Sequence, residues 1–112
     1  MSPQREDYVQ RQIRTIAAMI ARMIGLRLGG EPEQAKDELE RSYALLLDSQ
    51  ADLVRRVDAA TAARLIGSRE KIEAFAQLLD EEAEQAADEN RSAFLRGRAA
   101  ELKRFLQERE AP

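Results

Sequence analysis

The residues of this sequence best suited to chemistry are acidic side chains spaced three apart. Glu70 with Glu73, and Glu81 with Glu84, would each place two carboxylates on one turn of a helix. Paired carboxylates can hold magnesium, so a metal-dependent all-α nucleotide hydrolase is one alternative function. Both pairs fall on the same predicted helix, and no later helix supplies a second acidic turn. We therefore expect a solvated acidic face, with no metal site, no cofactor and no catalytic residue.

The residue types that are missing exclude much of the remaining enzyme chemistry. None of the 112 residues is a histidine or a cysteine. Those two residues supply most zinc ligands, thiol nucleophiles and proton carriers that work near neutral pH. A serine–histidine–aspartate triad, a zinc finger and a disulfide framework are impossible within this chain, and we expect that it is not an enzyme.

A second alternative, nucleic-acid binding, depends on the basic residues of the last predicted helix. These are Arg91, Arg96, Arg98, Lys103, Arg104 and Arg109. Single-stranded nucleic acid also requires exposed aromatic rings for stacking, whereas Phe94 and Phe105 fit the apolar stripe of that helix. The formal net charge is -3, which gives no overall attraction for phosphates. We expect these bases to pair with acids of the preceding helix.

The elements that position these residues are predicted to be helices throughout. In the first helix, about residues 5–28, apolar side chains recur at alternating spacings of three and four. Gly29-Gly30-Glu31-Pro32 supplies a glycine cap that ends this helix and a proline that begins the next. Because the connection is short, the second helix should fold back on the first, which gives a first hairpin over residues 5–48.

The rest of the chain repeats this arrangement after a linker. Residues 49–67 are predicted to be a linker with one short helix, which Asp58 caps at its N-terminus. Gly67-Ser68 marks the start of a second hairpin over residues 68–109. The sequence thus predicts an all-α fold of two antiparallel helical hairpins joined by a short helix, in a single domain that spans residues 1–112.

Charge is distributed so that each hairpin joins a helix of one sign to a helix of the other. The chain up to residue 28 carries a net +3, and residues 31–52 carry -5. Residues 68–89 carry -6, and residues 91–109 carry +4. Exposed ion pairs stabilise a fold by only about 0 to 1 kcal/mol each, so we expect them to select the pairing of helices.

The first hairpin resembles a tetratricopeptide repeat (TPR). Gly30, Ala35, Leu39 and Ser42 stand where that repeat places its inter-helix glycine and the packing residues of its second helix. The start of the chain, Glu6-Asp7-Tyr8-Val9-Gln10-Arg11-Gln12-Ile13, is similar to that of a bacterial family to which no activity is assigned. The resemblance implies a short TPR-like helical array.

The first helix has an apolar arc of about 200°, wider than one neighbouring helix can cover. One side of this arc carries Tyr8, Met19, Met23 and Leu26. That side meets either the second hairpin or another molecule, and we predict a protein partner, with a homodimer as the first choice. The predicted function is a non-enzymatic adaptor or self-associating scaffold. Because the N-terminus lacks the pattern of a signal peptide, we expect a cytoplasmic protein that does not bind membranes.

Overall fold

The computed structural model describes residues 3–110, with side chains from residue 7 to residue 109, and contains helices but no strands in that part of the chain. In chain order the elements are α1 (Pro3–Leu28), α2 (Pro32–Leu47), a 3-10 turn (Asp48–Gln50), α3 (Ala51–Arg56), α4 (Ala59–Ile66), α5 (Arg69–Gln85) and α6 (Glu89–Glu110). The predicted all-α class is confirmed. The side chain of Glu6, part of the N-terminal motif, lies outside the described residues.

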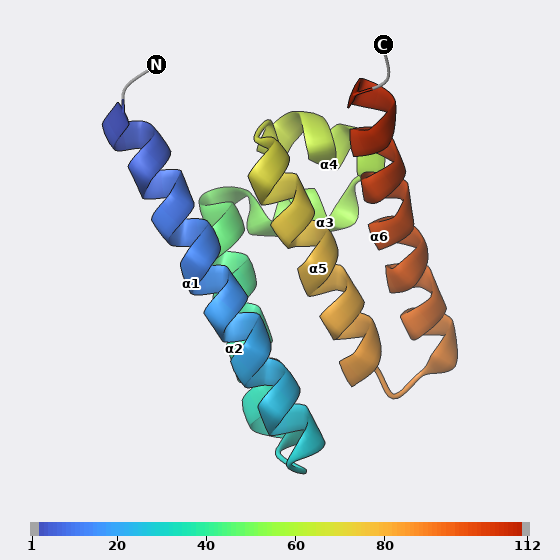
Figure 1. Ribbon diagram of the computed structural model, residues 1–112. Helices are drawn as coiled ribbons and strands as arrows, with labels where there is room; N and C mark the ends of the chain where they lie inside the picture. The colour runs from blue at the N-terminus through green and yellow to red at the C-terminus, as the bar shows by residue number, and fades with distance from the viewer. Residues whose placement is uncertain (1–2, 111–112) are drawn as a thin grey trace.

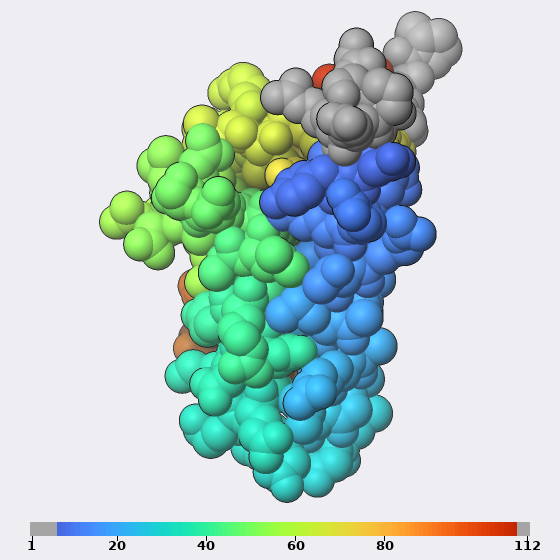
Figure 2. Space-filling view, turned by 90° about the vertical axis from the view of Figure 1, so that its left-hand side faces the viewer, coloured from blue at the N-terminus to red at the C-terminus, as the bar shows by residue number. Residues whose placement is uncertain are grey.

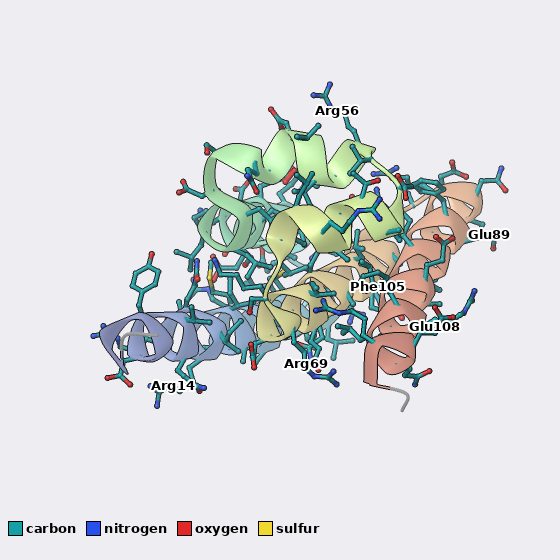
Figure 3. All side chains as sticks on the ribbon, turned by 90° about the horizontal axis from the view of Figure 1, so that it is seen from above. Arg14, Arg56, Arg69, Glu89, Phe105 and Glu108 are labelled. Carbon is teal, nitrogen blue, oxygen red and sulfur yellow. The ribbon has the colours of Figure 1, made fainter. Side chains whose placement is uncertain are left out.

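Two antiparallel hairpins, α1–α2 and α5–α6, lie side by side (Figure 1). Helix α5 is central, since it packs against α1, α2 and α6. Seen from above, α3 and α4 cover one side of the molecule, while α1, α5 and α6 form the opposite side (Figure 3). The linker between the hairpins therefore contributes to the packing, because α4 also contacts α6.

The turn between α1 and α2 forms for the reason that the sequence predicts. The amide of Glu31 donates to the carbonyl of Leu26 over 2.8 Å, and the amide of Gly30 donates to that of Arg27 over 3.2 Å. These two bonds make a Schellman motif, which needs a left-handed residue after the helix. Gly30 takes that conformation, with φ at +79°. Pro32 then begins α2.

The linker differs from the prediction, because it contains two short helices where the sequence predicts one. Asp58 caps α4 as expected, since its carboxylate accepts from the amide of Thr61 over 3.2 Å. The additional helix, α3, is too short to be stable alone. Its C-terminal carbonyls are bound by Arg98 of α6, a tertiary contact that no local pattern announces.

The core lies where α5 packs against the first hairpin and against α6. The ring of Phe75 on α5 packs edge-on against that of Tyr43 on α2, with 6.1 Å between ring centres. The apolar residues that recur at helical spacing on α5 are buried from Ile72 to Ala83. No helix in residues 3–110 is both long enough and apolar enough to cross a membrane.

Ion pairs join α5 to α6 as the charge pattern predicts. They are Glu82 with Arg91 at 3.3 Å, Glu84 with Arg96 at 3.0 Å, and Asp80 with Lys103 at 2.8 Å. The first hairpin follows the pattern less closely. Arg22 pairs with Glu38 over 3.6 Å. Arg27 instead reaches the second hairpin, where Nε and Nη2 each donate to Glu81 over 3.1 Å.

Candidate functional site

The four residues predicted as a partner surface differ in their exposure. Met23 is completely buried within the single chain, so the prediction that it contacts a partner is wrong. Met19 and Leu26 are half-buried. The sulfur of Met19 accepts a hydrogen bond of 3.6 Å from Ser42 of α2. Helix α2 thus packs on the flank of α1 that we expected to stay open, and Tyr8 alone remains mainly exposed, at 59%.

Tyr8 borders an open groove of about 480 Å³. The groove lies where α1, the end of α2, and the junction of α4 with α5 meet. Figure 2 faces α1, in blue, and α2 with its following turn, in cyan to green, with the start of α5 in yellow above them. Leu45 and Ile66 supply further apolar surface to the groove, and Leu45 is 39% exposed.

Gln12 lines this groove with half of its amide unpaired. Its Nε2 donates to the backbone carbonyl of Leu45 over 2.6 Å. That carbonyl lies in the last turn of α2, where helical partners run out, so Gln12 acts as a cap supplied by another helix. The other amide atom, Oε1, is buried and accepts no hydrogen bond from the described residues. Leaving a buried acceptor unpaired costs about 1 to 3 kcal/mol.

Asp48 gives the groove a strained backbone. Its φ is 54° and its ψ is -135°, and it is the one residue other than glycine with positive φ among residues 3–110. Such a conformation costs about 1 to 3 kcal/mol, and residues of this kind cluster at functional sites. The residue continues directly from α2 and turns the chain around the edge of the groove.

Lys71 completes the groove with a positive charge. Its side chain is half-buried, and it makes no ion pair with the described residues. Its backbone amide donates to the Ser68 hydroxyl over 3.4 Å, which is the N-cap of α5 that the sequence predicts. The groove therefore offers one cation and an exposed apolar wall. These groups can bind a ligand, and none of them forms a nucleophile–base pair.

Three of the four carboxylates considered for a metal site bind arginines, and the fourth, Glu70, accepts a hydrogen bond of 3.0 Å from the Ser68 hydroxyl. Glu81 binds Arg27, and Glu84 binds Arg96, which holds the pKa of Glu84 below its usual value. Glu73 binds Arg69 over 3.1 Å. Within the described residues no three acidic side chains come together in a way that would hold a metal ion.

The basic surface predicted on α6 is largely used inside the molecule. Arg91, Arg96 and Lys103 pair with acids of α5. Arg98 is buried and, among the described residues, pairs with no acid of α5, so the prediction that it pairs with the preceding helix is wrong. Its guanidinium donates to three backbone carbonyls of the linker, at 2.6 Å to Arg55, 2.6 Å to Val57 and 3.3 Å to Val54.

The aromatic residues of α6 also differ from expectation. Phe94 is 55% exposed, so it does not belong to the apolar stripe as predicted. The guanidinium of Arg91 lies 5.7 Å from the centre of its ring. Phe105 is half-buried against the core, with Arg109 at 5.6 Å from its ring centre. Stacking of nucleic-acid bases would require these two rings, and each of them already has an arginine beside it.

Sequence reasoning did not find Gln12, Asp48 or Lys71. A signal exists for Gln12, because an uncharged polar residue stands within the apolar arc of α1. Asp48 and Lys71 carry no comparable signal, since each becomes notable only through the position of other helices. No protein-family model, curated protein or solved structure matches this chain.

Proposed function

We propose that this protein is a non-enzymatic, TPR-like helical adaptor that binds a segment of another protein in the groove beside Tyr8. The observation that carries the proposal is an open groove that combines the exposed apolar side chains of Tyr8 and Leu45 with Lys71, which has no carboxylate partner among the described residues. Binding sites usually combine apolar side chains with a few fixed polar groups.

The arrangement of the hairpins supports the TPR-like part of the proposal. In arrays of helical repeats, each helix pair stacks on its neighbour and buries a continuous core. Here α5, the first helix of the second hairpin, packs against both helices of the first. The arginine partners of Glu81, Glu82 and Glu84 support the non-enzymatic part, since these carboxylates already hold the helices together.

Site-specific photocrosslinking tests the proposed function. A benzoylphenylalanine at Tyr8 should crosslink a defined protein from native lysate, and unlabelled partner added in excess should abolish the crosslink. The same residue at Phe94, which is comparably exposed on α6, serves as the matched control. If both positions crosslink the same proteins, or if neither crosslinks any, the groove is not a protein-binding site.

Self-association is a second candidate, favoured by an apolar strip on the open flank of α1. Leu28 is 75% exposed and Ile24 is 37% exposed. Ala17 and Ala21 continue the strip along the same flank and are also exposed. Light scattering should then show a dimer at tens of micromolar that Leu28→Glu converts to a folded monomer. A wild-type protein that stays monomeric under these conditions would exclude this candidate.

A further inference from the structure

We infer that the segment bound beside Tyr8 is a peptide in which an aliphatic side chain lies next to an acidic one. This inference rests on the proposed function and adds the chemistry of the partner. Two features of the groove determine it: the side chain of Lys71, and the apolar wall of Tyr8, Leu45 and Ile66.

Lys71 selects an acidic residue. Its half-buried side chain has lost part of its hydration and has no carboxylate partner among the described residues. An incoming carboxylate would satisfy it with a charge-assisted hydrogen bond, the strongest kind available here. Asp48 is the other charged residue among those that line the groove, and it is exposed. Its negative charge repels a second acid, which directs a single carboxylate toward Lys71.

The apolar wall selects the neighbouring aliphatic side chain. Tyr8 and Leu45 are 59% and 39% exposed, and Ile66 is half-buried beside them. Covering these surfaces removes apolar area from water, which favours binding by about 25 cal/mol for each square ångström. A wholly charged peptide would leave this apolar surface exposed to water, so an acidic residue alone is insufficient for binding.

Phage display of random heptapeptides on the whole protein tests the inference. The wild-type protein should enrich peptides with an acidic residue beside leucine, isoleucine or valine. Lys71→Glu should reverse the charge preference and enrich lysine or arginine at that position. Lys36→Glu makes the same change on a different groove, between α2 and α5, and should leave the selected peptides unchanged.

One selected peptide is then synthesised and its Kd measured by fluorescence polarisation. Lys71→Ala should weaken binding about tenfold, which corresponds to about 1.4 kcal/mol. A Kd that Lys71→Ala leaves unchanged contradicts the contact between Lys71 and the acidic residue of the peptide.

The outcomes separate this inference from the proposed function. If Tyr8→Arg weakens peptide binding but Lys71→Glu selects the same acidic peptides, the acidic preference is wrong and the groove remains the binding site. If Tyr8→Arg leaves the Kd unchanged, the peptides bind elsewhere and both proposals fail. If no peptide is enriched, the inference is overturned, while crosslinking at Tyr8 still decides whether the groove binds a folded partner.

Discussion

The hydroxyl of Tyr43 donates a hydrogen bond of 2.7 Å to Oε1 of Glu82, and this bond joins α2 to α5 in the interior. The guanidinium of Arg55 lies 4.0 Å from the centre of the tyrosine ring and also contacts Glu82 at 3.5 Å. Arg91 of α6 reaches the second oxygen of the same carboxylate. Glu82 therefore holds four helices together, and the tyrosine is its closest partner.

Tyr43→Phe tests the weight of that hydrogen bond. We expect the free energy of unfolding to fall by about 1 kcal/mol, because Glu82 loses one donor and keeps two arginines. Urea denaturation followed by circular dichroism measures this change. Tyr8→Phe removes a hydroxyl from an exposed ring and should change stability by less than about 0.5 kcal/mol. Equal effects of the two variants would contradict the importance of the buried bond.

The same tyrosine should make stability fall in alkaline solution. Burial, followed by the negative charge of Glu82, raises the pKa of Tyr43 above its usual value of 10.0. Since the folded pKa is raised, the contribution is fully present below pH 10 and is lost as pH rises further, at about 1.4 kcal/mol per pH unit. The stability advantage over Tyr43→Phe should shrink above pH 10. An advantage that stays constant from pH 8 to pH 11 would disprove this linkage.

Arg98→Met should be among the most destabilising single changes. It preserves the length of the side chain but removes the donors to the carbonyls of Val54, Arg55 and Val57. We expect a loss of about 3 kcal/mol, because buried carbonyls become unpaired. Chemical denaturation measures the loss, with Arg104→Met on the exposed face of the same helix as the control. If the two variants are equally stable, α3 does not depend on the guanidinium.

Asp48→Gly should stabilise the protein by about 1 kcal/mol, because glycine adopts positive φ without strain. Asp52→Gly makes the same change within α3 and should instead lower stability by a few tenths of a kcal/mol. Differential scanning calorimetry of the two variants measures the contrast. A destabilised Asp48→Gly protein would show that the aspartate side chain, and not its backbone, determines this position.

The sequence predicts the ends of the helices well, because caps are local. Ser68 and Asp58 are N-caps, and Gly30 and Pro32 make the first turn, as their types and spacing indicate. It predicts the pairing of α5 with α6 from opposite charges. Periodicity also identifies α1 as broadly apolar, which is why Tyr8 was recognised as a candidate.

The rest depends on where neighbouring helices lie. Periodicity shows which face of a helix is apolar, but not which neighbour covers it. The pattern shows that α1 needs more than one neighbour, but not that α2 contacts Met19 and Met23 is buried while Ile24 and Leu28 stay exposed. Arg98 illustrates the same limit. Among five other bases on the last helix it looks exposed, and only the position of α3 makes it a buried donor.

The buried guanidinium of Arg98 also affects how two copies of the chain behave while they fold close together. Small helical proteins can exchange hairpins between two copies, which is called domain swapping, when the segment that joins the hairpins extends. Here Arg98 joins that segment to α6 of the same chain by hydrogen bonds. Burial lowers the pKa of Arg98, but the guanidinium keeps its charge. Domain swapping would first break the hydrogen bonds between the Arg98 guanidinium and three backbone carbonyls of the linker. This barrier favours chains that close on themselves over interlocked pairs.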